Sequence, residues 1–199
     1  MKTQKYTYLH SLVIIPLLAT TMSVGGSVPV TDLNHTLIFN LPSLVSAPKE
    51  LTPEEKERSI KAAKIDAYFA KYNMPLEGYG MKFVLEAENS GIDPYLVPAI
   101  SVIESTGGKF SCKSVRNSFL GWGGCKIGFE SIDLAIHTVS QHLGGHKDST
   151  DQWYEGKTLT QILKRYNSVI PTYSTKVTKV MDAMSSMEVS TDKQLALNS

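Results

Sequence analysis

The sequence has little of what marks several common classes of protein. Basic and acidic side chains nearly cancel, to a net charge of +1, and no basic stripe stands out. Neither the GxGxxG pattern of dinucleotide-binding folds nor the GxxxxGK[ST] pattern of phosphate-binding loops occurs. We therefore expect no cofactor and no nucleic-acid partner. The length of 199 residues is enough for one ordinary domain with a core of its own.

Charged side chains are also missing from a long stretch near the N-terminus. None occurs between Lys5 and Asp32, and the most apolar part of the stretch runs from Leu12 to Ala19. A basic start, a short apolar run and then small residues predict a signal peptide over residues 1–26. Residues 9–30 are just long enough to cross a bilayer, so an uncleaved membrane anchor is the alternative. Both alternatives predict export to the periplasm, the cell wall or the extracellular space.

Cysteine is scarce, and its spacing is unlike that of a metal or redox motif. The chain has 2 cysteines, Cys112 and Cys125, and no CxxC pair. In an exported protein we expect them to form a disulfide. The closed loop of 14 residues, counted inclusively, would stabilise the fold by roughly 3 kcal/mol. The alternative is two unrelated buried thiols.

A metal site is not expected either. His142 and His146 are four residues apart, and His137 and Asp148 are close to them in the sequence. These residue types can bind metal ions. However, two consecutive glycines separate the pair and would break the helix that has to align the two imidazoles.

Helical periodicity dominates residues 52–188, which we predict to be one mainly α-helical domain. Residues 27–51 are predicted to be a linker and residues 189–199 a flexible tail. Thr52, Pro53 and Glu55 have the pattern of a capped helix start. Further helices are predicted after a turn within residues 75–91, ending at Gly91, then from Asp93, from Ser131 to Gly144, near 159–166 and near 172–187. The glycine-rich stretch 107–128, between the third and fourth helices, is predicted to be a small loop or hairpin lobe closed by the disulfide.

One glutamate, Glu104, lies at the end of the most apolar of these helices. Val97 and Ile100 are seven and four residues before it, so all three share one helix face. Apolar surroundings raise the pKa of a carboxyl group, because they disfavour its ionised form. A carboxyl that stays protonated can donate a proton to a leaving group, as glycoside cleavage requires. The alternative is a buried ion pair with a lysine or arginine of another helix.

Three sequence elements resemble the lytic transglycosylases and related bacterial glucosaminidases of the lysozyme-like superfamily. The segment "IDPYLVPAISVIESTGGKF" resembles their catalytic helix, which ends in Glu-Ser followed by small residues. The segment "RNSFLGWGG" resembles an Asn-x-Phe-Gly element, and "ILKRYNSVIPTY" contains a later Tyr-Asn pair. The sequence departs from the family pattern at Leu120, inserted before Gly121, and at Thr106, where glucosaminidases often have glycine.

The resemblance implies a lysozyme-like helical domain that cleaves peptidoglycan glycan strands. Glu104 would be the general acid at the β-1,4 bond between N-acetylmuramic acid and N-acetylglucosamine. Tyr166 would be a second catalytic residue, which orients the carboxyl or the sugar. The resemblance also implies a set of substrate-binding residues: Ser105, Asn117, Phe119, Trp122 and Asn167.

The choice between transglycosylase and hydrolase depends on a second carboxylate. Hydrolases normally need one, and Glu130 is the first candidate. Between Lys109 and Phe129 there is no Asp or Glu, which favours the one-carboxylate transglycosylase mechanism. A non-catalytic cell-wall glycan-binding module of the same fold is the alternative function.

Overall fold

The computed structural model describes residues 50–190, in which seven α-helices form and no β-strand is present. The predicted mainly α-helical class is confirmed. The predicted signal peptide or anchor, nearly all of the predicted linker and most of the tail lie outside the described residues. The helices are α1 (Pro53–Lys71), α2 (Gly80–Asn89), α3 (Leu96–Ser105), α4 (Ile132–Leu143), α5 (Asp151–Tyr154), α6 (Leu159–Tyr166) and α7 (Tyr173–Ser185).

Side-chain caps set several helix starts where the sequence predicts them. The Thr52 hydroxyl accepts the Glu55 N–H at 3.2 Å, and the Glu55 carboxylate accepts the Thr52 N–H at 2.7 Å. Ser131 caps α4 in the same way, by accepting the N–H of Leu134. The short helix α5 was not predicted, because four residues are too few to show a helical period.

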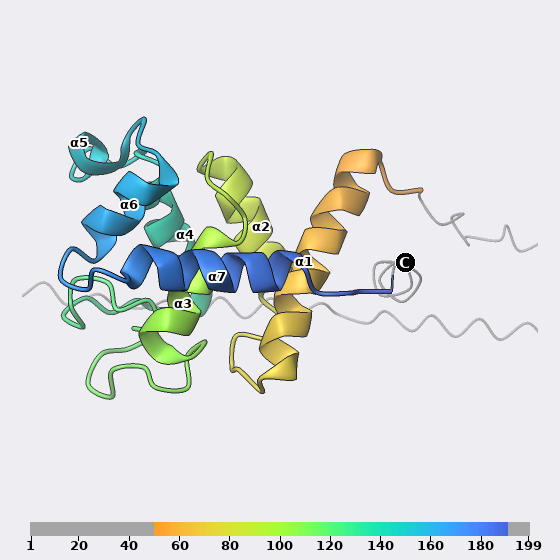
Figure 1. The fold of residues 1–199 in the computed structure, drawn as a ribbon, viewed down its shortest axis with the longest axis horizontal. Coiled ribbons are helices and arrows are strands. Elements are labelled where there is room, and N and C mark those ends of the chain that lie inside the picture. Colours follow the sequence, from red (N-terminus) through yellow and green to blue (C-terminus); the bar gives the residue numbers. More distant parts are fainter. Residues whose placement is uncertain (1–49, 191–199) are drawn as a thin grey trace, which may run out of the picture. The chain divides into compact units, whose positions relative to one another are not determined.

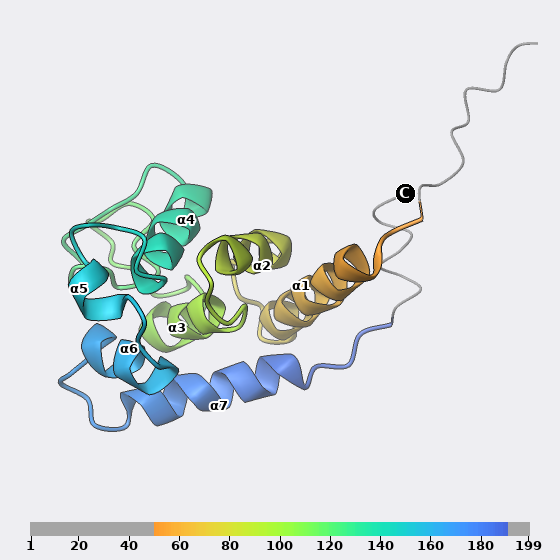
Figure 2. The same ribbon diagram turned by 90° about the horizontal axis from the view of Figure 1, so that it is seen from above.

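The most apolar helix, α3, lies at the centre of the domain. Every residue from Leu96 to Ser101 is buried. Figures 1 and 2 both show α7 running alongside α3, and α1 packs against α2 and α7. Tyr173 of α7 and Ile100 of α3 are among the largest fully buried side chains. Thus the C-terminal end of α3, which carries Glu104, is held by packing along the rest of the helix.

A buried carboxylate links α2 to α4. Glu86 is 7% exposed, and its two oxygens lie 2.8 Å from Lys82 Nζ and 2.8 Å from His137 Nδ1. Burial raises the pKa of Glu86, but the hydrogen bonds from Lys82 and His137 outweigh it and leave the pKa below its ordinary value. The pair of contacts therefore favours the ionised carboxylate between the two helices.

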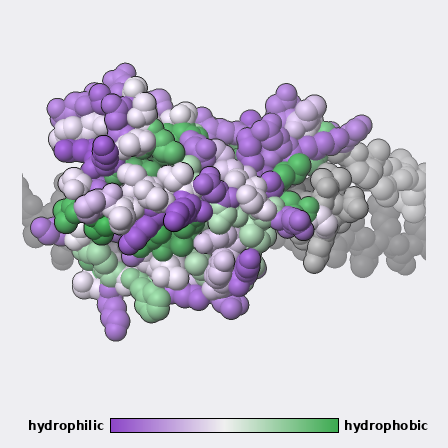
Figure 3. Space-filling view, viewed as in Figure 1, coloured by the Kyte–Doolittle hydropathy of each residue, from purple (hydrophilic) through white to green (hydrophobic). Residues whose placement is uncertain are grey.

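The surface of the domain mixes hydrophilic and apolar residues. On the face shown in Figure 3, apolar residues form small separate patches among hydrophilic ones. None of the helices between residues 50 and 190 combines the length and the hydropathy that crossing a bilayer requires.

Candidate active site at the end of helix α3

Helix α3 ends immediately after Glu104 and Ser105. Thr106, Gly107 and Gly108 have φ values of 54°, 61° and 96°, and three left-handed residues in a row cannot continue a right-handed helix. A Cβ atom on Gly107 would come within 2.7 Å of the Met74 sulfur, so glycine is needed there for space as well as conformation. The Thr-Gly-Gly sequence thus ends the helix directly after the glutamate, which lies in its last turn instead of in the helix interior.

The Ser105 hydroxyl joins this helix end to the glycine-rich loop. It donates to the Phe119 carbonyl at 2.7 Å and accepts the Gly108 N–H at 2.9 Å. Ser105 itself is 3% exposed. The hydrogen bonds of this hydroxyl therefore go to the protein backbone, and the predicted contact of Ser105 with substrate stays a prediction.

The carboxyl group of Glu104 is half-buried between α7 and the glycine-rich loop. Tyr173 Oη donates a hydrogen bond to one carboxylate oxygen at 2.7 Å. The other oxygen lies against Gly121, where a Cβ atom would overlap it. No lysine, arginine or histidine within residues 50–190 forms an ion pair with Glu104, so the predicted alternative of a buried ion pair finds no partner there.

Burial sets the acidity of Glu104. Loss of water around the carboxyl raises its pKa, and the hydrogen bond from Tyr173 opposes that rise without cancelling it. The predicted direction of the pKa shift is confirmed. A carboxyl of this kind keeps its proton to higher pH than an exposed glutamate does.

Two stacked tyrosines flank the carboxyl. The rings of Tyr166 and Tyr173 are 6.1 Å apart and nearly parallel, at 10°. The Tyr166 hydroxyl donates to the Leu120 carbonyl at 2.6 Å, and burial, followed by the charge of Glu104, raises its pKa well above the ordinary value. Tyr173 therefore makes the hydrogen bond to the carboxyl, and Tyr166 holds the glycine-rich loop beside it; the orienting role of Tyr166 towards a sugar stays a prediction.

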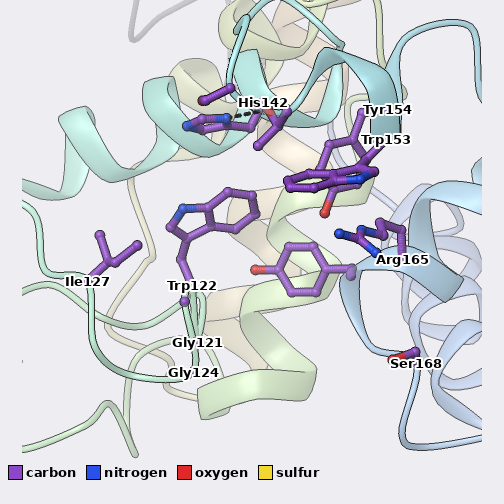
Figure 4. A pocket seen from close by; sticks show the side chains of 13 residues that line it. Gly121, Trp122, Gly124, Ile127, His142, Trp153, Tyr154, Arg165 and Ser168 are labelled. Carbon is purple, nitrogen blue, oxygen red and sulfur yellow. Dashed lines mark hydrogen bonds between the residues drawn. The ribbon is translucent and has the colours of Figure 1, made fainter.

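A cavity of about 720 Å³ opens beside these groups. Figure 4 shows that Trp122, Trp153, His142 and Arg165 surround it. The Trp122 ring lies 5.0 Å from the His142 ring and 5.7 Å from the Tyr166 ring. Glu104 does not line this cavity, but Gly121, which contacts its carboxyl, and Tyr166 both do. The cavity therefore adjoins the acid through a glycine and a tyrosine ring.

No family model matches this chain, and no curated protein or solved structure matches it. The resemblance to peptidoglycan-cleaving enzymes therefore rests on the three sequence elements, and the structure adds the arrangement of their residues. Of the substrate-binding residues that the resemblance implies, Trp122 is the one that lines the cavity.

The remaining three residues of that set shape the surrounding loops. Phe119 is 3% exposed and belongs to the hydrophobic core. The Asn117 amide donates to the Phe129 carbonyl at 2.9 Å, across the loop. The Asn167 side chain accepts the N–H groups of Val169 and Ile170, just after α6. Each of these side chains is thus engaged within the protein, and the predicted direct role in binding stays a prediction.

The predicted disulfide between Cys112 and Cys125 is present. It closes the part of the glycine-rich stretch that contains the carbonyls of Phe119 and Leu120. The stretch is a loop of turns without strands, so the loop form of the two predicted forms is correct.

Sequence reasoning missed Tyr173, Trp153 and Arg165. Tyr173 is 69 residues from Glu104 in the chain, and its hydrogen bond exists only because α7 packs against α3. Trp153 belongs to the unpredicted helix α5. A signal was available for Arg165, since it directly precedes the Tyr-Asn pair that the resemblance singled out.

Proposed function

We propose that this chain is an exported enzyme that cleaves peptidoglycan glycan strands, with Glu104 as its general acid, and that its helical domain has the lysozyme-like fold. One observation carries the proposal. The carboxyl at the end of α3 is half-buried, has a raised pKa, takes its hydrogen bond from a tyrosine and adjoins an aromatic cavity. A carboxylate that only stabilised the fold would be expected to have a cation as its partner.

In the proposed reaction the Glu104 carboxyl protonates the glycosidic oxygen between N-acetylmuramic acid and N-acetylglucosamine. Burial keeps the proton on the acid, and Tyr173 fixes the orientation of the carboxyl. Gly121 has no side chain, so it contacts the other carboxylate oxygen without covering it. The tryptophan rings of the cavity offer flat apolar faces to the C–H faces of sugar rings.

The one-carboxylate transglycosylase mechanism fits this arrangement better than hydrolysis. The segment between Lys109 and Phe129, whose Gly121 contacts the carboxyl, contains no Asp or Glu that could act as a second acid. In this mechanism the ionised Glu104 next acts as a base for the 6-hydroxyl of muramic acid, whose attack gives a 1,6-anhydro product. For a hydrolase, Glu130 remains the first candidate for a second acid; its side chain is exposed, directly before the cap of α4.

A non-catalytic glycan-binding module is the second candidate function. The cavity supports it, because aromatic walls bind sugars with or without a nearby acid. The raised pKa of Glu104 favours the enzyme, since binding alone does not need a protonated carboxyl.

The substitution Glu104→Gln tests the proposal. Glutamine keeps the shape and can still accept the hydrogen bond from Tyr173, but it cannot donate a catalytic proton. We expect the rate of digestion of purified peptidoglycan to fall on the order of 100-fold or more. The melting temperature should stay the same or rise, because a buried ionisable group becomes neutral. If Glu104 were half of an ion pair, the variant would instead lose roughly 3 kcal/mol of stability.

The exposed Glu130 provides the matched control, Glu130→Gln. For a transglycosylase this variant should digest peptidoglycan at the wild-type rate, and mass spectrometry of the products should show anhydro-muramic ends, lighter by one water. Reducing N-acetylglucosamine ends together with an inactive Glu130→Gln would identify a hydrolase. A Glu104→Gln variant that digests at the wild-type rate per folded molecule would overturn the general-acid proposal.

A further inference from the structure

A cation without an acidic partner faces the aromatic cavity. The guanidinium of Arg165 lies 4.1 Å from the centroid of the Trp153 ring, in the last turn of α6. Figure 4 shows both side chains at the same wall of the cavity. Neither Asp nor Glu lines the cavity, and no carboxylate in residues 50–190 pairs with Arg165. The stacking holds the guanidinium beside the ring and leaves its N–H groups for a ligand.

Among the residues that line the cavity, Arg165 is the one that carries a permanent positive charge. His142 Nδ1 lies 2.6 Å from the Thr150 hydroxyl. Burial, followed by the charge of Lys147, lowers the pKa of His142, so the imidazole is neutral near pH 7. Trp122, Trp153 and Tyr154 contribute ring surface. This combination suits a ligand that has a flat apolar face and a carboxylate within reach of Arg165.

We propose that this cavity binds a sugar unit that carries a carboxylate, with Arg165 as the residue that recognises the charge. The inference rests on the proposed function, because it concerns the substrate of the same site. In peptidoglycan, N-acetylglucosamine is neutral, whereas muramic acid carries a lactyl carboxyl, either free or extended by a stem peptide that has carboxyl groups of its own. Arg165 would thus distinguish muramic acid from glucosamine and set the register of the strand against Glu104.

The test compares the binding of two tetrasaccharides that differ in this charge. One is chitotetraose, which is neutral, and the other is a β-1,4 tetrasaccharide of alternating N-acetylglucosamine and N-acetylmuramic acid. Binding to the full chain carrying Glu104→Gln is measured by calorimetry, so that cleavage does not interfere. We expect the muramic probe to bind about tenfold more tightly or better, as a charge-assisted hydrogen bond implies. Adding Arg165→Gln should remove this difference while chitotetraose binding stays unchanged.

Arg165→Lys is the conservative variant, and it should keep part of the preference and make it more sensitive to salt. A third probe, the muramic tetrasaccharide with stem peptides, identifies the source of the carboxylate: an Arg165-dependent preference limited to this probe assigns it to the peptide. Equal affinities for chitotetraose and for both muramic probes overturn the proposal. So does a preference that survives Arg165→Gln, or an equal loss of both affinities, which would mean that Arg165 acts on Trp153 packing alone. These results are independent of wall digestion by the wild type, so either proposal can fail without the other.

Discussion

One hydroxyl group, that of Tyr173, contacts the carboxyl on which the proposed chemistry depends. Its hydrogen bond stabilises the carboxylate and so opposes the effect of burial on the Glu104 pKa. The ring is 1% exposed and stacked on Tyr166, so the hydroxyl has little freedom to turn away. Tyr173 therefore controls two properties of the acid, its orientation and its proton affinity.

The variant Tyr173→Phe separates these two properties. Burial of Glu104 then acts unopposed, so its pKa rises further and the acid keeps its proton to higher pH. Because a general acid works only when it is protonated, the alkaline limb of the pH–rate profile should move to higher pH. The rate at the optimum should fall on the order of tenfold, because the carboxyl loses its positioning partner. Digestion of peptidoglycan across a range of pH measures both effects.

Tyr95→Phe is the control for this experiment. Tyr95 precedes α3, and its hydroxyl makes no hydrogen bond within the part of the chain that the structure describes. The pH–rate profile of the Tyr95→Phe variant should match that of the wild type. If Tyr173→Phe left the alkaline limb in place, Glu104 would not be the group that the limb reports.

The glycine-rich loop acts as a unit around the acid. Its Phe119 and Leu120 carbonyls accept hydrogen bonds from Ser105 and Tyr166, and Gly121 contacts the Glu104 carboxyl. All three of these residues lie inside the loop that the Cys112–Cys125 disulfide closes. The disulfide thus limits the conformations of the segment that surrounds the acid from one side.

Reduction of the disulfide should therefore lower activity more than it lowers helix content. The bond closes a short loop with a sequence separation of 13, so its loss should cost roughly 3 kcal/mol. The loop contributes Phe119 and Leu120 to the core, but most core side chains come from the helices themselves. Far-UV circular dichroism should therefore change little while peptidoglycan digestion slows. The double variant Cys112→Ala/Cys125→Ala should behave like the reduced protein and should not respond to reductant. Equal rates before and after reduction would show that the loop holds its shape without the bond.

The sequence predicted helices best where local chemistry determines them. The capping box of Thr52 and Glu55, the Ser131 cap and the end of α4 at Gly144 are all interactions between residues close in the chain. The partial burial of the Glu104 carboxyl and the direction of its pKa shift were also accessible, because the helical period places it beside apolar residues. The partners of that carboxyl were not, since they depend on how α6, α7 and the loop pack around α3.

The contacts of Phe119 and Asn117 also could not be predicted from local sequence. Both were predicted to contact substrate because of the motif that contains them. In the structure the Phe119 ring is in the core and the Asn117 amide bonds to Phe129, which are contacts that no spacing within the motif specifies. The contacts of these two side chains within the protein therefore could not be read from the motif, and their contact with substrate stays a prediction.

The domain as a whole should lose stability in acid through the link between α2 and α4. Glu86 has a lowered pKa in the folded protein, so its contribution is present above the ordinary value of 4.5 and is lost as the pH falls through the folded pKa. Glu86→Gln should cost about 1–2 kcal/mol at pH 7 and should flatten the fall in stability below about pH 4.5. Denaturant unfolding of both proteins at several pH values measures this difference.

Two other groups, His142 and Glu104, also change the stability of the domain with pH. The effect of Glu86 is therefore measured as the difference between Glu86→Gln and the wild type. The lowered pKa of His142 also reduces stability on acidification, but in a higher range, below its ordinary 6.5. The raised pKa of Glu104 acts in the opposite direction, since the folded state then binds its proton more readily. Glu88→Gln, which breaks the exposed pair with Arg58, is the control and should change stability by less than about 1 kcal/mol. A parallel pH dependence in Glu86→Gln and wild type would contradict the role of Glu86.

Both tryptophans of the chain, Trp122 and Trp153, line the same cavity. Nearly all of the intrinsic fluorescence that is excited at long wavelength must therefore originate at the candidate site. Emission from the unlabelled protein reports on the filling of the cavity and on the environment of Arg165 and His142, whose side chains lie beside the two indoles. Rearrangements confined to α1 or α2 should leave this signal unchanged, so the protein contains its own optical probe of the site.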